Sequence, residues 1–212
     1  MAYDLEEQEK LDAIKAWWAR WGTLLLGLAT VIVLAWAASA GWKAYQGYRA
    51  NQAMGYFEAL EDAARLGGAD SAVRIKAAAA TLRDDYPATG YAGRGALVAA
   101  AALIEQKDTD GARQQLEWLA SQEKQPALAP VARLRLAGML LDQKQYDAAL
   151  AQLNNPPAPF AALYADRRGD VLAAQGKREE ARTAWQQAVD GLGAANPLTQ
   201  AVQLKLDALT GA

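Results

Sequence analysis

The sequence predicts an all-α protein, in which one N-terminal transmembrane helix is followed by a solenoid of helical hairpins. A run of 22 residues without a charge extends from Trp21 to Trp42. Alanine is abundant, whereas glycine and proline occur in clusters, and this composition favours helices joined by turns. Between the clusters, apolar residues follow helical spacing, as in Leu97, Ala100, Ala101 and Ile104. No stretch alternates strictly enough to predict a strand.

The uncharged run has the length and the flanking residues of a membrane-spanning helix. At about 1.5 Å per residue it would be about 33 Å long, close to a hydrocarbon core of about 30 Å. Aromatic rings with a polar edge settle at the headgroup level, so both ends carry expected interface anchors. These anchors are Trp17, Trp18 and Trp21 before the run, and Trp42, Tyr45 and Tyr48 after it. The two aromatic belts favour a spanning helix over a buried core helix.

A cleaved signal peptide is the alternative interpretation, because Ala38-Ser39-Ala40 resembles a cleavage site. However, the run exceeds the usual apolar core of about 7–15 residues, and an acidic segment precedes it, so an uncleaved anchor is favoured. Three basic residues precede the run and two, Lys43 and Arg49, follow it closely. This small difference favours a cytoplasmic N-terminus. The predicted organisation is a cytoplasmic tail over 1–20, a span over 21–42 and an exported domain over 43–212.

The composition of the exported part excludes several kinds of function. Three of the 22 basic and five of the 24 acidic residues precede position 43, which leaves 19 of each after it. A neutral domain gives no electrostatic reason to expect nucleic acid as a partner. The chain has no cysteine and no histidine, so it contains no His- or Cys-dependent catalytic triad or metal site. With no phosphate-binding loop either, we expect a non-enzymatic protein without cofactor or metal.

Clusters of turn-forming residues divide the exported part into short helices. The expected stem covers 43–85, with helices over 43–66 and 70–84; the repeats cover about 90–193, and a capping helix covers about 197–209. Residues 43–66 lack proline, so the stem can continue directly from the membrane helix. The expected breaks are Gly67-Gly68, Tyr86–Gly90, Lys107–Gly111, Pro126–Pro130, an extended connector at Pro156–Pro159, and Gly191–Gly193.

The clearest hairpin, over 168–188, resembles a tetratricopeptide repeat. Gly169 lets two helices approach, Gly176 forms the turn and Trp185 fills the groove between the helices. The small residues Ala100, Ala137 and Gly169 are 37 and 32 positions apart, around the usual period of about 34. The alternative is a helical bundle with coincidental spacing. The expected packing positions are Ala100, Ala112, Leu116, Leu136, Ala137, Ala149, Leu153, Gly169, Ala181, Trp185 and Ala188.

Stacked hairpins have a concave side formed by the first helix of each pair, and partners bind there. A partly apolar surface with a few charges is expected on this side, although some of its residues could instead pack against the next repeat. The expected residues are Arg94, Leu97, Ala101, Ile104, Leu134, Leu141, Asp166 and Asp170.

The N-terminus makes the resemblance more specific. Glu6-Glu7-Gln8-Glu9-Lys10 and Ala13-Ile14-Lys15-Ala16-Trp17-Trp18 precede a span rich in small residues. Further blocks are Tyr86–Ala92, Arg133–Ala137 and Arg168–Leu172. Together they resemble the YfgM-type ancillary subunits of the SecYEG translocon over nearly the whole chain.

This resemblance implies a single-pass protein of the Gram-negative inner membrane, with the N-terminus in the cytoplasm and the repeat domain in the periplasm. The implied partners are the SecYEG translocon, a membrane-anchored periplasmic chaperone of the prolyl-isomerase type and newly exported proteins. No catalytic residues are implied. The alternative function is a membrane-anchored scaffold for other envelope complexes, such as those of cell-wall synthesis.

Overall fold

The computed structural model describes residues 2–210, and it describes the side chains of residues 7–209. Residues 2–210 form helices joined by turns, with one short 3-10 helix and no strand among them. Helix α1 covers Ala2–Leu66. The chain divides into two compact units after Arg49, so α1 contributes its first part to one unit and residues from Ala50 onward to the other.

The first unit is a single helix with its apolar side chains exposed. Trp36 is 72% exposed and Leu34 is 64% exposed. The rings of Trp17 and Trp18 lie 6.4 Å apart, and those of Trp42 and Tyr45 lie 5.8 Å apart. Among the described residues, α1 is the one helix long and apolar enough to cross a membrane.

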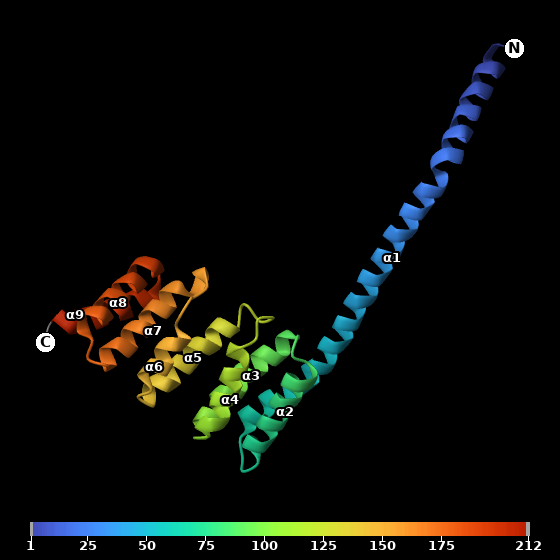
Figure 1. Ribbon diagram of the computed structural model, residues 1–212. Helices are drawn as coiled ribbons and strands as arrows, with labels where there is room; N and C mark the ends of the chain where they lie inside the picture. The colour runs from blue at the N-terminus through green and yellow to red at the C-terminus, as the bar shows by residue number, and fades with distance from the viewer. Residues whose placement is uncertain (1, 211–212) are drawn as a thin grey trace. The chain divides into compact units, whose positions relative to one another are not determined.

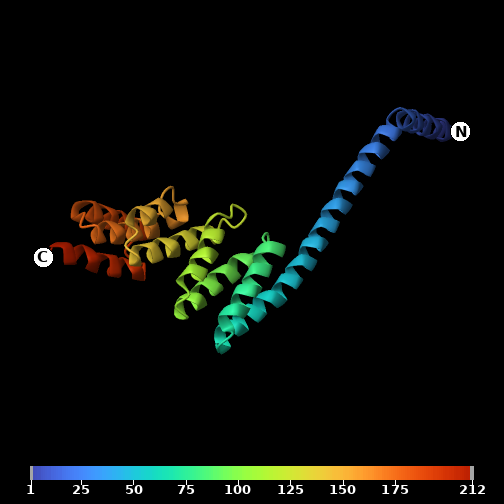
Figure 2. The ribbon, with the colours of Figure 1, turned by 60° about the horizontal axis from the view of Figure 1, so that its bottom comes forward.

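The second unit is a stack of helical hairpins whose elements follow one another in chain order (Figures 1 and 2). Gly67 and Gly68 both have positive φ, which allows the sharp turn at the end of α1. The remaining elements are α2 (Ser71–Asp85), α3 (Gly90–Glu105), α4 (Thr109–Ala120), α5 (Ala129–Asp142), α6 (Tyr146–Gln152), η1 (Ala158–Phe160), α7 (Ala161–Ala174), α8 (Arg178–Leu192) and α9 (Pro197–Thr210).

Three equivalent turns show that the hairpins of α3–α4, α5–α6 and α7–α8 are repeats. The turn residues Lys107, Lys144 and Gly176 have φ values of 64°, 58° and 79°, in the left-handed region. They are separated by 37 and 32 residues, the spacing of Ala100, Ala137 and Gly169. The amide of the residue after each one donates to the carbonyl of Leu103, Leu140 or Leu172, closing the helix as a Schellman motif.

Several expected turn boundaries are wrong by a few residues, and two of them have a clear local cause. The turn at 107–111 ends earlier because the Asp108 carboxylate accepts a hydrogen bond of 2.9 Å from the Gly111 amide, so α4 already begins at Thr109. Pro130 lies in the first turn of α5, where its missing N–H costs nothing.

The proline-rich connector is extended in only its first part. Pro157 has φ −59° and ψ 144°, whereas Ala158–Phe160 form a 3-10 turn that contains Pro159. Helix α6 has only seven residues, so Leu153 follows the helix as its C-cap and is nevertheless fully buried.

The core consists largely of alanine and leucine from successive hairpins. One buried cluster extends from Ala53 to Val171 and a second joins α7, α8 and α9. Tyr164 is fully buried, and its hydroxyl donates to the carbonyl of Pro130 at 3.0 Å, which links α7 to α5. The expected packing positions are all buried. They comprise Ala100, Ala112, Leu116, Leu136, Ala137, Ala149, Leu153, Gly169, Ala181, Trp185 and Ala188.

Candidate partner-binding groove

A groove of about 560 Å³ lies on the first helices of successive hairpins, where the sequence predicts a concave face. Ala101 and Ile104 of α3 line it, together with Gly138 and Met139 of α5 and Arg167 of α7. Ile104 is 47% exposed, a high value for an isoleucine in this domain. We call this surface the α3–α5–α7 groove.

A neighbouring hollow of about 400 Å³ continues the groove towards the end of α1. It shares Ala101, Glu105 and Arg135 with the groove, and adds Leu97 and Ala64. The Arg135 guanidinium donates through Nη1 to the Leu97 carbonyl at 3.2 Å, which holds the side chain across the boundary between the two hollows. The two hollows therefore adjoin each other, and we refer to them together as the channel.

Several predicted face residues lie in this channel or beside it. Leu97, Ala101 and Ile104 line it. Arg94 lies one turn before Leu97, with its guanidinium carbon 4.8 Å from the ring centroid of Tyr91 and 5.6 Å from that of Phe57. Stacking on two rings restricts the arginine without neutralising its charge.

Leu134 and Leu141 differ from expectation, because both are only partly exposed and pack against the main buried cluster. In the first helix of a repeat, the neighbouring hairpin covers part of the inner face. Gly138 and Arg135, on the same helix, line the channel instead.

Asp166 and Asp170 are paired within the domain, so the expectation that they face a partner needs correction. Lys205 Nζ of α9 lies 2.6 Å from Asp166 and 2.7 Å from Asp170. Trp185 Nε1 also donates to Asp170 at 3.2 Å. Burial lowers the pKa of Lys205, but its hydrogen bonds to the two carboxylates and their charge outweigh this, so its pKa is raised overall. The two acids hold the last helix in place.

The sequence reasoning missed Arg135, Gly138 and Arg167. Arg135 and Arg167 each lie two residues before a small packing residue, Ala137 and Gly169, so they occupy equivalent positions in successive repeats. This shared register is the signal that could have identified the pair.

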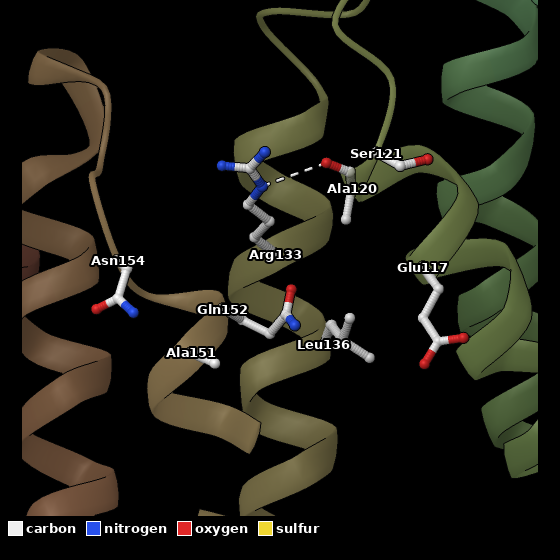
Figure 3. Close-up of a pocket in the computed structure, with 8 residues that line it drawn as sticks. All are labelled: Glu117, Ala120, Ser121, Arg133, Leu136, Ala151, Gln152 and Asn154. Carbon is white, nitrogen blue, oxygen red and sulfur yellow. Dashed lines mark hydrogen bonds between the residues drawn. The ribbon is translucent and has the colours of Figure 1, made fainter. Parts of the chain in front are cut away.

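A second, smaller pocket of about 290 Å³ lies between α4, α5 and α6 (Figure 3). Its central Arg133 donates through Nε to the Ala120 carbonyl at 3.2 Å, as the dashed line in Figure 3 shows. Glu117 at its rim pairs with Arg113 at 2.7 Å. The main charged groups of this pocket therefore already have partners.

The channel has the features of a binding surface. It combines an apolar floor with guanidinium groups, and small residues allow a partner's main chain to approach closely. Among the described residues, no group of three or more Asp, Glu, His or Cys side chains could hold a metal ion.

Comparisons with known proteins agree with this architecture. The tetratricopeptide repeat-like domain family matches residues 15–211. The chain is 35% identical to the ancillary SecYEG translocon subunit of Neisseria gonorrhoeae, over 99% of this chain and 100% of the relative. It is 27% identical to the proteins of that name from Escherichia coli, over 96% and 97%, and Aggregatibacter actinomycetemcomitans, over 99% and 100%. No solved structure matches the chain significantly.

The similarity therefore includes the apolar helix as well as the repeats, in relatives that carry the same description. A matching repeat domain and a relative above 30% identity over the full length together show that this chain belongs to the family of ancillary SecYEG translocon subunits.

Proposed function

We propose that this chain is a membrane-anchored, non-enzymatic ancillary subunit of the SecYEG translocon, and that its repeat domain links the translocon exit to periplasmic chaperones. The observation that carries the proposal is the similarity to ancillary translocon subunits over both the apolar helix and the repeats. A protein that shares both parts has a means of membrane placement and a surface for recognition.

In this proposal, residues 21–42 cross the inner membrane and residues 43–212 lie in the periplasm, with 1–20 in the cytoplasm. Trp17, Trp18, Trp21, Trp42 and Tyr45 would anchor the helix at the two interfaces, and all five side chains are exposed in the first unit. Anchoring raises the effective concentration of the repeat domain near a membrane-embedded partner without requiring new contacts.

Topology is tested with a reporter. An alkaline phosphatase that is active only after export, fused after Ala212, should be active in a Gram-negative host. A reporter that functions only in the cytoplasm should be inactive at the same position. The reverse result would contradict the proposed orientation.

Partner identity is tested by affinity purification of the full chain from membranes in mild detergent. SecY and a membrane-anchored periplasmic chaperone of the prolyl-isomerase type are the expected co-purifying proteins. A chain in which an unrelated apolar span replaces residues 21–42 separates placement from recognition, because it keeps the repeat domain at the membrane. Recovery of cell-wall synthases in place of translocon components would instead support the scaffold function.

A further inference from the structure

Two guanidinium groups in the α3–α5–α7 groove lack the strong partners that arginines usually have. Arg135 makes one hydrogen bond, to the Leu97 carbonyl, and pairs with no carboxylate among the described residues. Arg167 Nη1 lies 3.4 Å from Asp170, at the long end of an ion pair, and the Arg167 Nε is buried without a hydrogen-bond partner in the described part of the chain. With a single long ion-pair contact, the Arg167 guanidinium keeps N–H groups to which an incoming acceptor could bind.

The floor beside these arginines is apolar and unusually open. Ala101 and Gly138 occupy equivalent positions in successive repeats, each one residue after the small packing residue. A Cβ atom added to Gly138 would be 3.6 Å from the Arg167 guanidinium carbon, so the glycine leaves room directly beside the charge. Ile104 provides the exposed aliphatic surface of the same groove.

The acidic residues that line the groove lie at one edge of it. Glu105 is the last residue of α3 and Asp142 is the last residue of α5, so both lie at the hairpin-turn edge. Both also line the groove, and neither pairs with Arg135 or Arg167. A bound acidic group is therefore attracted to the middle of the helices and repelled from the turn edge.

From this arrangement we propose that the groove binds a short extended peptide segment of a partner protein, in which a carboxylate side chain alternates with aliphatic side chains. The carboxylate would accept hydrogen bonds from Arg135 and Arg167, and an aliphatic neighbour would cover Ala101 and Ile104. A volume of about 560 Å³ suits a few residues rather than a folded surface. The proposal rests on the proposed adaptor function and specifies the chemistry of the segment that the adaptor recognises.

The test uses the full chain in detergent and two labelled peptides. One is fluorescein-Gly-Leu-Asp-Leu-Glu-Leu-Gly, and the other replaces Asp and Glu by Asn and Gln. We expect the acidic peptide to bind about tenfold more tightly in fluorescence anisotropy, because charge-assisted hydrogen bonds are stronger than neutral ones. The preference should decrease as salt is raised. Equal affinity for the two peptides, or binding of neither, overturns the proposal.

Variants of the groove residues test whether the preference for the acidic peptide arises in the groove. Arg135→Gln and Arg167→Gln should each remove most of the preference for the acidic peptide, whereas Ile104→Ser should weaken both peptides alike. Arg182→Gln, which removes an exposed charge on the α8 surface, is the matched control and should change neither affinity. Circular dichroism establishes whether each variant is folded. If a variant does not fold, the comparison of the two peptides on the unmodified chain still decides the proposal.

The peptide test and the purification test distinguish failure of the proposed groove chemistry from failure of the proposed adaptor function. If SecY and the chaperone co-purify but the acidic preference is absent, the inferred chemistry of the groove is wrong and the adaptor function stands. If the preference is present but no translocon component co-purifies, the adaptor function fails and the groove chemistry stands.

Discussion

At the scale of single residues, the contact between Gly169 and Trp185 is the tightest packing constraint in the third repeat. A Cβ atom at position 169 would overlap the indole ring, which also donates to the Asp166 carbonyl at 3.2 Å. The ring therefore has little freedom to move away. Because any side chain there overpacks the hairpin, this position requires glycine.

We predict that Gly169→Ala lowers the free energy of unfolding by about 1–3 kcal/mol. Trp185→Ala should cost about 3–5 kcal/mol, because it leaves a cavity between α7 and α8. Chemical denaturation of the full chain in detergent measures both. Gly55→Ala is the matched control, since nothing lies within 4 Å of its added methyl group, and it should be neutral or stabilising. An unchanged midpoint for Gly169→Ala would show that this packing is not strained.

The left-handed turns predict that substitutions at the equivalent positions Lys144 and Gly176 change the stability of the domain in opposite directions. Lys144 has φ 58°, which costs energy for a residue with a side chain, whereas Gly176 has φ 79° at no such cost. Gly176→Ala should therefore destabilise the domain by about 1–2 kcal/mol. Lys144→Gly should leave stability unchanged or raise it by a few tenths of a kcal/mol, because relief of strain exceeds the added freedom of the unfolded chain. Equal destabilisation by both variants would contradict the equivalence of the two turns.

Whether the role of a residue can be predicted from the sequence depends on whether its packing partners follow the repeat period. Gly169 could be assigned from spacing, because helix packing repeats with the sequence period. Asp166 and Asp170 could not, because their partner Lys205 lies at least 35 residues away, and no local pattern reveals such a pair. The channel arginines Arg135 and Arg167 differ in this respect, because their shared register with Ala137 and Gly169 could have identified them.

At the scale of elements, α9 is held by one charged cluster as well as by apolar burial. Val202 and Leu206 are buried against the second cluster, and Lys205 is both paired with two carboxylates and 5.8 Å from the Trp185 ring centroid. Removing one partner of such a cluster leaves the others without compensation. The last helix is therefore sensitive to a single substitution on its inner face.

We predict that Lys205→Met loosens α9, seen as faster amide exchange in α9 and α8 than in the unmodified chain. Lys205→Arg, which keeps the charge, should restore most of the protection. Since pairing raises the pKa of Lys205, its stabilisation is complete below the unfolded pKa of about 10.4 and is lost as pH rises through the folded value. Equal exchange at neutral pH in the methionine variant would show that apolar burial alone holds the helix.

The element boundaries show why the fold class is easier to predict than helix ends. Alanine-rich periodic segments indicate helices whatever their surroundings. The start of α4 at Thr109 depends instead on one hydrogen bond from Gly111 to Asp108, and the end of α6 on the cap at Leu153, whose amide donates to the Leu150 carbonyl. Such ends are decided by single contacts, which the sequence pattern does not record.

At the scale of the whole domain, the short α6 and the connector after it mark a seam. The first buried cluster covers the hairpins before the seam and extends into α7 only through Tyr164 and Val171, whereas the second joins α7, α8 and α9. In a stack of repeats, stability is the sum of repeat and neighbour contributions, so the two parts can open separately.

We predict that hydrogen exchange resolves two cooperative units that meet near residues 154–160. Trp185→Ala should accelerate exchange throughout α7–α9 while leaving α2–α4 unchanged. In contrast, Leu116→Ala, in the first cluster, should accelerate α3 and α4 with little effect on α9. Uniform acceleration of the whole domain by either variant would mean that the stack unfolds as one unit.

The buried phenol of Tyr164 gives the domain an internal spectroscopic reporter. Burial raises its pKa, and the nearby Arg133 charge offsets this only in part. An exposed tyrosine absorbs as phenolate near 295 nm once the solution passes about pH 10. Among the chain's eight tyrosines, Tyr164 should therefore ionise at a higher pH than an exposed tyrosine, and more readily once α5 and α7 separate and its hydroxyl loses the hydrogen bond to Pro130. A spectrophotometric titration, with Tyr164→Phe as its reference, would follow the parting of two neighbouring repeats without any added label.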